Sequence, residues 1–362
     1  MEYTPTSVQE VVAAAVDALG GVASLIRPGS RVLGKPNLLM AIEPESGVTT
    51  HPEVVRAVIK ILKTIDCTIF LGDGPSIWGA QSEKVDEVYE KTGMSRVAQE
   101  EGITLVTFEK KRWREKFPLT TWVDTCDALV NVPKFKTHGL TLLTGAIKNL
   151  YGLVWETHKV ELHKKYFDQA DFAKIIVDIY QEAKPCLTVV DGVVAMEGDG
   201  PSTRGTLRNL GLILASTDCV ALDTILALIM GISPQDVLTT KEAYLRGLGT
   251  AHIENITILG EQLNELTQQP FLLPASSIQN KIPLPLLNLV KKFITFYPYV
   301  ESPRCTQCAR CIKACPQKIM ALRNKLILIN YAKCIRCFCC QEICPSAAIK
   351  IKKSLLAKIV GL

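Results

Sequence analysis

Residues 305–316 read CTQCARCIKACP, and residues 334–345 read CIRCFCCQEICP. Both stretches keep the spacing Cys-x2-Cys-x2-Cys-x3-Cys-Pro, so the chain carries two copies of one short cysteine pattern. Nine of its 13 cysteines fall within residues 305–344. Because the N-terminus MEYTPTSVQE lacks the order of a secretion signal, we expect these thiols in the reducing cytoplasm, where metal ligation is favoured over disulfides.

The repeated pattern resembles that of two-cluster bacterial ferredoxins, over about residues 301–352. In such a run the first three cysteines reach irons of one [4Fe-4S] cluster, and the fourth, which precedes proline, ligates the other cluster. We therefore predict two clusters, the first held by Cys305, Cys308, Cys311 and Cys344 and the second by Cys334, Cys337, Cys340 and Cys315. Cys339 is additional to the pattern, and a buried thiol beside a cluster is favoured over a ligand role.

A pair of zinc sites is the alternative, because four-cysteine zinc sites also use short spacings. Zinc-binding cysteines normally come as two separated Cys-x2-Cys hooks. Here four cysteines and the following proline keep identical offsets in both copies, which favours iron–sulfur clusters.

Charge is distributed unevenly along the 362 residues. Residues 270–362 contain 15 Lys and Arg against 2 Asp and Glu, whereas residues 1–269 contain 26 against 34. Two differently built parts are joined, and the length suffices for two domains. We predict an α/β domain over 1–265, a Pro-rich apolar strap over 266–300, a ferredoxin domain over 301–352 and a basic apolar tail over 353–362.

Strand-like apolar runs alternate with helix-period segments before residue 265. Strands are expected at 32–33, 68–71, 128–132, 187–190 and 212–214, and helices at about 7–19, 52–64, 82–91, 171–183, 218–230 and 236–246. The helix at 52 has its start signal in Thr50 and Pro52. This alternation predicts an α/β fold, a mostly parallel sheet with helices on both faces, followed by a small α+β ferredoxin-like domain.

Polar residues follow four of the predicted strands, at 35–37, 72–75, 134–138 and 191–192. Ligands of open α/β sheets bind beyond the carboxyl ends of the strands, so we expect a cleft there. Its candidate catalytic residues are His138, Lys136, Lys148, Asp73, Asp191 and Asp199.

Lysines and the amides of two Gly-Asp-Gly-Pro turns, at 72–75 and 198–201, suit the anionic group of a small substrate. His138 or a carboxylate suits proton transfer. Ordinary turns and solvated loop charge are the alternatives, and a surface helix is favoured for His158 and His163 in the run HKVELHKKYFD. Whether a further metal occupies the cleft is left open.

Several stretches together resemble the domain of unknown function 362 family, over about residues 28–250. They are KPN (35–37), TTHPEVVRAVI (49–59), GDGP (72–75), NVPKFKTHGLTLLTGAIKNLYG (131–152), DGVVAMEGDGP (191–201) and ALD (221–223). The resemblance implies an iron–sulfur protein with an appended two-cluster module, without an assigned reaction. A distant similarity in layout to the N-terminal domain of nickel-pincer lactate racemases carries over no site residue, since its ligand histidines have no match here.

No stretch approaches the roughly 20 apolar residues of a membrane-spanning helix. The strap PFLLPASSIQNKIPLPLLNLVKKFITFYPYV (270–300) is not a flexible Gly/Ser linker, and we expect it to fix the ferredoxin domain against the α/β domain. A peripheral membrane contact by residues 291–297 and 352–360 is the alternative.

The favoured function is that of an oxidoreductase whose clusters relay electrons to a substrate or metal in the cleft. No GxGxxG or P-loop is present, so an acidic ferredoxin or flavodoxin is the expected donor, facing Lys313, Lys318, Arg323, Lys333 and Arg336. The alternative is a non-catalytic electron carrier or cluster-handling protein whose α/β domain docks a partner. Purely structural clusters are disfavoured, and no stacking platform indicates nucleic acid.

Overall fold

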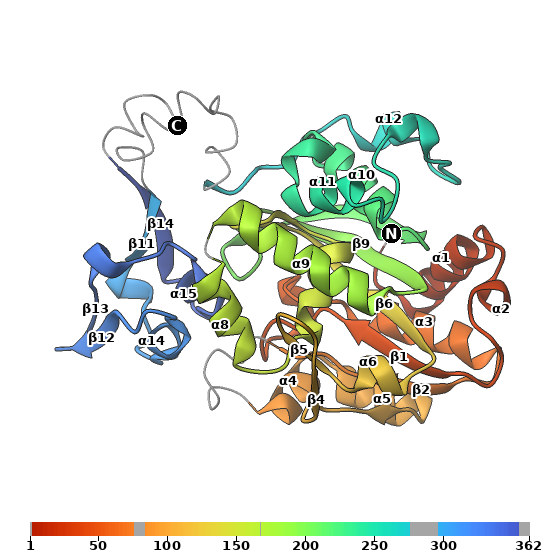
Figure 1. Cartoon of the computed structure of the whole chain (residues 1–362), viewed down its shortest axis with the longest axis horizontal. Coiled ribbons are helices and arrows are strands. Elements are labelled where there is room, and N and C mark those ends of the chain that lie inside the picture. The colour runs from red at the N-terminus through yellow and green to blue at the C-terminus, as the bar shows by residue number, and fades with distance from the viewer. Residues whose placement is uncertain (1, 76–83, 167, 276–295, 355–362) are drawn as a thin grey trace.

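The computed structural model describes residues 2–75, 84–166, 168–275 and 296–354. In this part of the chain eight strands form one sheet, in the order β3-β2-β1-β6-β9-β7-β8, with β10 paired to β9 (Figure 1). Only β8 and β10 run antiparallel to their neighbours, so the mostly parallel α/β sheet is confirmed. The strands are β1 (Arg31–Pro36), β2 (Thr68–Leu71), β3 (Thr104–Leu105), β6 (Ala128–Val132), β7 (Lys134–His138), β8 (Leu142–Thr144), β9 (Leu187–Gly198) and β10 (Gly205–Ser216).

Helices cover both faces of this sheet, as the alternation of elements predicts. Successive side chains of a strand point to opposite faces, and in β1 Val32 and Leu33 accordingly pack into two different hydrophobic clusters. The face of Val32 is covered by α1 (Pro5–Asp17), α3 (Pro52–Lys63), α4 (Val85–Lys91) and α5 (Met94–Glu101). The face of Leu33 is covered by α7 (Ala146–Asn149), α8 (His158–Lys165), α9 (Gln169–Ala183), α10 (Cys219–Ile229) and α11 (Leu238–Leu245).

Helix α3 begins at Pro52, as predicted, but its cap is His51 rather than Thr50. The His51 side chain accepts the backbone N–H of Glu53 at 3.2 Å. Thr50 Oγ1 instead donates to the carbonyl of Val132 at 2.7 Å. The entry to α3 is thereby tied to the end of β6.

Residues 134–138 form strand β7 rather than a loop after the preceding strand. The strand lies beside the second half of β9, where Lys134 pairs with Asp191. Because side chains alternate along a strand, Lys134, Lys136 and His138 point to one face. Asp191 accordingly lies inside the 12-residue strand β9 and not beyond its end.

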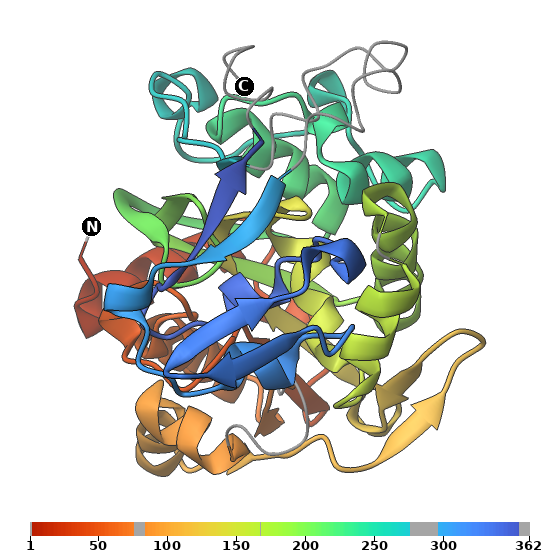
Figure 2. The same cartoon turned by 90° about the vertical axis from the view of Figure 1, so that its left-hand side faces the viewer.

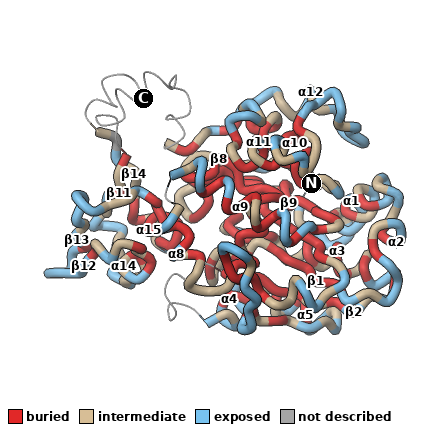
Figure 3. Tube along the Cα trace, in the orientation of Figure 1, coloured by how far each residue is buried: buried red, intermediate tan, exposed pale blue. Residues whose placement is uncertain are grey.

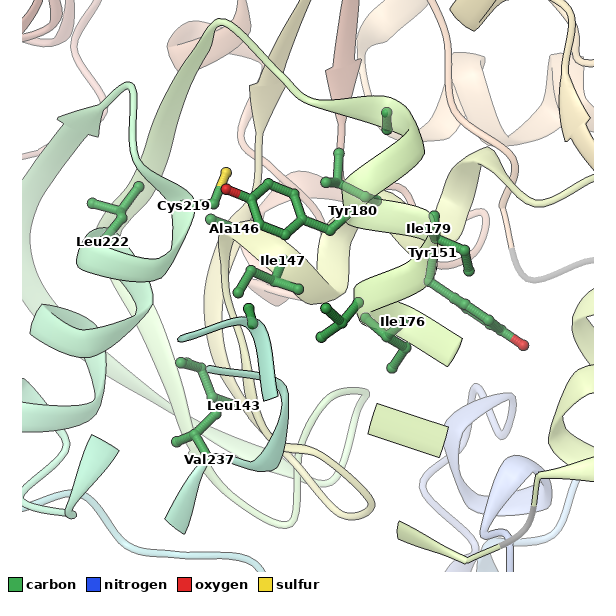
Figure 4. Close-up of a cluster of buried hydrophobic side chains, with 14 of the residues drawn as sticks. Leu143, Ala146, Ile147, Tyr151, Ile176, Ile179, Tyr180, Cys219, Leu222 and Val237 are labelled. Carbon is green, nitrogen blue, oxygen red and sulfur yellow. The ribbon is translucent and has the colours of Figure 1, made fainter. Parts of the chain in front are cut away.

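Buried apolar side chains of two other helices pack against the short helix α7. Figure 4 shows Ile147 of α7 together with Ile176 of α9 and with Cys219 and Leu222 of α10. Tyr151, just after α7, points its hydroxyl out of this cluster (Figure 4). The packing fixes the helix that carries Lys148.

The cysteine-rich domain, residues 296–354, is built from β11 (Phe296–Val300), α14 (Arg310–Ala314), β12 (Met320–Arg323), β13 (Leu326–Ile329), α15 (Cys339–Glu342) and β14 (Ile349–Lys353). Strand β11 pairs with β14, so this domain takes in the end of the sequence predicted as a strap. Residues 276–295 of the strap and 355–362 of the tail lie outside the described residues, as does most of the predicted membrane contact. None of the described helices combines the length and apolar character needed to cross a bilayer.

The cysteine-rich domain lies at one end of the sheet, beside α8 (Figures 1 and 2). Thr203 Oγ1 donates to the carbonyl of Cys344 at 2.8 Å, and Arg204 donates to the carbonyl of Ala347 at 2.9 Å. Val160 of α8 packs against the buried residues around Cys339. Buried residues concentrate in the sheet and its helices, whereas the β12–β13 hairpin is mostly exposed (Figure 3).

Candidate functional site

The eight repeated cysteines line two separate cavities in the cysteine-rich domain. One cavity is lined by Cys305, Cys308, Cys311 and Cys344, and the other by Cys315, Cys334, Cys337 and Cys340. The fourth cysteine of each run thus lies with the first three of the other run. This is the crossed arrangement that a two-cluster ferredoxin needs.

The two cysteine loops share one backbone conformation. Gln307 and Ala309 have φ of 58° and 59°, and Arg336 and Phe338, at the same places in the second loop, both have φ of 58°. Left-handed residues alternating with right-handed ones turn successive backbone N–H groups to one side, which suits an anionic cluster. The loops therefore fit two equivalent iron–sulfur clusters.

No three His, Cys, Asp or Glu side chains of the described residues converge closely enough to hold a single metal ion. A zinc site needs its thiolates within about 2.3 Å of one ion, whereas a cubane distributes them over four irons. The four cysteines around each cavity match the four thiolates that one cubane needs. Among the described residues, the cleft likewise presents no such group.

Cys339 is fully buried and lines neither of these cysteine cavities. Its Sγ lies 3.8 Å from the carbonyl oxygen of Cys337. It packs with Ala314 and Ile343 against Val160 of α8. Its surroundings are those of a buried thiol at the domain boundary.

A third cavity, of about 60 Å³, lies between the two domains. It opens at the carboxyl ends of β1 and β2, where Asn37 and Asp73 line it, and α15 closes it with Glu342. Its ionisable lining residues are Asp73, Lys136, His138, Lys148, Tyr151, Lys159, His163 and Glu342. We call it the lysine cavity.

Four of the six predicted cleft residues line this cavity: Asp73, Lys136, His138 and Lys148. Asp191 and Asp199 do not. The Asp191 carboxylate pairs with Lys134 at 2.9 Å and accepts the Tyr3 hydroxyl at 2.7 Å, which anchors the N-terminal segment. Asp199 Oδ1 accepts the backbone N–H of Ala275 at 2.9 Å.

The Gly-Asp-Gly-Pro stretch at 72–75 serves close packing rather than a left-handed turn, since neither of its glycines has a positive φ. A Cβ on Gly74 would lie 2.5 Å from the carbonyl oxygen of Gly152 and 2.6 Å from Lys159 Nζ. In the copy at 198–201, Gly198 does have a positive φ, of 73°. Gly74 is therefore required for the lysine to approach the backbone.

The lysine side chains around the cavity are largely buried, and only some of their N–H groups donate hydrogen bonds. Lys35, behind the cavity, pairs with Asp73 at 2.7 Å. Lys136 donates to the carbonyl of Val48 at 2.5 Å, and Lys159 donates to the carbonyl of Gly74 at 2.6 Å. Burial lowers the pKa of Lys136 and of Lys159 to about 7.

Lys148 differs from the other three lysines in keeping some contact with solvent. Its ammonium lies 4.8 Å from the centroid of the Tyr151 ring, a cation–π contact. No described carboxylate forms an ion pair with it. Burial of the ammonium lowers its pKa to about 8, against the opposing charge of Glu342.

His138 presents a neutral N–H donor to the cavity. Its Nδ1 accepts the backbone N–H groups of Leu140 at 3.0 Å and Thr141 at 3.3 Å, so Nδ1 is unprotonated. Burial lowers the pKa of His138 well below its usual value, so the ring stays neutral at pH 7 and carries its proton on Nε2. Nε2 lies 3.6 Å from Glu342 Oε1, on the cavity side.

The cavity wall near α7 is ordered by a chain of amides. Asn149 Nδ2 donates to Asn131 Oδ1 at 2.8 Å, and Asn37 Nδ2 donates to Asn149 Oδ1 at 2.9 Å. This chain orients Asn37 Oδ1, which is buried and has no hydrogen-bond partner in the described structure. Thr144 Oγ1, on the same cavity, is likewise unpartnered there.

Asp223 positions α7 and, through it, Lys148. Its carboxylate accepts the backbone N–H groups of Ala146 at 2.6 Å and Ile147 at 3.1 Å. We expect Asp223→Ala to lower the free energy of unfolding by about 2–5 kcal/mol, because each buried N–H left without an acceptor costs about 1–3 kcal/mol. Urea unfolding followed by circular dichroism measures this.

The exposed carboxylate of Asp236 provides the control for that measurement. Asp236→Ala should change the free energy of unfolding by no more than about 0.5 kcal/mol. Equal losses in the two variants would contradict the positioning role of Asp223.

Sequence reasoning missed Lys159 and Glu342 and assigned His163 to a surface helix. Lys159 and His163 both lie in α8, four residues apart, and this spacing places them on one helix face. That spacing is the signal that could have separated them from the exposed lysines around them. Glu342 carried no such signal, because it stands among cluster cysteines.

Residues 32–227 match the family described as Domain of unknown function (DUF362), and residues 297–345 match the 4Fe-4S dicluster domain. The chain is 31% identical over 246 residues to the thylakoid-associated protein sll1697 of Synechocystis sp. (strain ATCC 27184 / PCC 6803 / Kazusa), covering 66% of this chain and 75% of that protein.

Among solved structures, the lactate racemase apoprotein from Thermoanaerobacterium thermosaccharolyticum matches with a TM-score of 0.39 and 12% identity. The match covers 59% of this chain and 52% of the racemase chain, so the chain spans about half the length of that protein. Similarity at this level carries no argument about activity.

Proposed function

This chain belongs to the family described as Domain of unknown function (DUF362), and we propose that it is a redox protein in which two [4Fe-4S] clusters pass electrons to a ligand in the lysine cavity. We assign the first cluster to Cys305, Cys308, Cys311 and Cys344, and the second to Cys315, Cys334, Cys337 and Cys340. The protein would work in the reducing cytoplasm, where thiolate ligands persist.

One observation carries the proposal: helix α15 serves both the second cysteine cavity and the lysine cavity. It contains Cys340, and two residues further along the chain Glu342 lines the lysine cavity. Electron transfer slows steeply with distance, so a ligand against α15 would be well placed to receive electrons from the second cluster. A carrier that only docks a partner has no need of a cavity at this point.

The clusters, when bound, supply single electrons. The chain's own residues would do the remaining work. The ammonium groups of Lys136, Lys148 and Lys159 would balance negative charge on the ligand as it gains electrons. The Nε2–H of His138 would orient a ligand oxygen, and lysines with pKa near 7 would supply protons at neutral pH.

An acidic ferredoxin or flavodoxin is the proposed electron donor. Arg323, Lys325 and Lys333 are exposed on the cysteine-rich domain, and cationic residues around a cluster favour encounter with an acidic partner. Association that slows as ionic strength rises would support this donor class.

The experiment is a redox titration of the anaerobically reconstituted full chain, followed by electron paramagnetic resonance. Lys148→Gln removes a positive charge from the lysine cavity, which shares α15 with the second cysteine cavity, so the reduction potential of one cluster should fall. Lys164→Gln, an exposed lysine of α8, should leave both potentials unchanged. If Lys148→Gln also leaves both reduction potentials unchanged, the charge of Lys148 does not act on the clusters. That result would favour the electron-carrier alternative.

A further inference from the structure

The lysine cavity has an excess of positive charge. Four lysines, Lys35, Lys136, Lys148 and Lys159, meet two carboxylates there, those of Asp73 and Glu342. Lys35 and Asp73 neutralise each other at 2.7 Å. Glu342 lies 3.6 Å from the neutral His138 ring and forms no described ion pair with a lysine. The other three ammonium groups therefore have one carboxylate nearby, which none of them contacts.

These ammonium groups also have unused hydrogen-bond donors. An ammonium offers three N–H groups. In the described structure Lys136 uses one, on Val48, and Lys148 has only the ring face of Tyr151. Lys159 donates to the carbonyl of Gly74 and, at 3.5 Å, to that of Pro75. The remaining N–H groups are available to an acceptor inside the cavity.

Two neutral donors complete the set. His138 offers Nε2–H, because its Nδ1 is occupied by backbone N–H groups. Thr144 lines the cavity and is only 3% exposed. Its hydroxyl, Oγ1, has no hydrogen-bond partner in the described structure. A buried hydroxyl without a partner is costly, which indicates that a ligand supplies the missing bond.

We propose that the lysine cavity is a binding site for a small oxyanion, held by Lys136, Lys148 and Lys159 with Thr144 and His138 as neutral donors. This inference rests on the proposed function, because it concerns the same cavity. It adds the class of ligand to which the electrons would pass. Burying several ammonium groups together is unfavourable, and a bound anion offsets that cost. Donors from β7, β8, α7 and α8 approach from different directions, which suits several oxygens on one centre.

The volume limits the size of that oxyanion. The cavity measures about 60 Å³, far below the roughly 300–1,000 Å³ of pockets that hold drug-sized ligands, so only a small group fits inside. Acetate, hydrogencarbonate and phosphate are of this size. A nucleotide or a long-chain acid would have to extend out of the cavity.

The test is isothermal titration of the oxidised, iron-loaded full chain with acetate, hydrogencarbonate and phosphate. Acetamide, a neutral molecule of the size of acetate, is the ligand control. We expect saturable binding of at least one anion at one site and none of acetamide. Tightest binding of acetate would indicate a carboxylic acid as the natural ligand, and tightest binding of phosphate an inorganic oxyanion.

Lys148→Gln should lower the affinity for the anion at least about tenfold, because it removes a positive charge that is poorly hydrated in the cavity. The matched control Lys164→Gln should bind as the wild type does. The inference is overturned if no anion binds the wild-type protein saturably, or if Lys148→Gln binds as tightly as Lys164→Gln.

Failure of this inference is distinguishable from failure of the proposed function. The titration uses oxidised protein and needs no electron transfer, whereas the potentials above are measured without added anion. Anion binding with unchanged potentials would contradict the relay alone. A shifted potential without anion binding would contradict the oxyanion site alone.

Discussion

Cys308→Ala should reduce the iron content of the anaerobically reconstituted chain from about eight to about four atoms. Cys308 lines one cysteine cavity with the other three cysteines of its set, so its loss removes a thiolate from one cluster. The second cavity keeps all four of its cysteines. Iron and acid-labile sulfide analysis measures the change, and the resonance signal of the reduced protein identifies the surviving cluster.

Cys339→Ala is the matched control in the same domain. Cys339 lines neither cysteine cavity, so about eight irons should remain. Retention of about eight irons by Cys308→Ala would show that the ligand sets are assigned wrongly. A loss of about four irons from Cys339→Ala would make Cys339 a ligand.

Asp73→Asn should lower the free energy of unfolding by about 3–5 kcal/mol. The substitution keeps the shape of the side chain but removes the charge that pairs with Lys35 at 2.7 Å. Lys35 has no exposed surface, and an uncompensated charge in that position cannot be hydrated. Chemical unfolding of the reconstituted chain measures the loss.

Two further variants separate this effect from general damage. Asp171→Asn breaks an exposed ion pair, in which Lys174 Nζ lies 3.0 Å from Asp171 Oδ1. It should lower the free energy of unfolding by less than about 1 kcal/mol. Replacing both members of the buried pair, with Lys35→Met and Asp73→Leu, should restore much of the stability, because no charge is then left unpaired. Equal losses in Asp73→Asn and Asp171→Asn would contradict a buried ion pair.

Local sequence patterns predict part of the candidate site. The sequence predicts Asp73, Lys136 and His138 from their places after strands, and Lys148 as a further candidate near them in the sequence. All four line the lysine cavity. Asp191 was predicted by the same reasoning but lies inside β9, because the strand continues to Gly198. A single glycine after an aspartate did not mark the end of that strand.

The α/β class and the presence of a 4Fe-4S dicluster domain followed from the sequence itself, because both depend on short-range patterns: the period of apolar residues and the spacing of cysteines within two loops. The lysine cavity was decided by tertiary structure alone. It brings Asp73, Lys136, Lys159 and Glu342 together from four distant segments. Glu342 reaches it only because the cysteine-rich domain packs on the end of the sheet, and burial there, rather than residue type, lowers the pKa of the lysines.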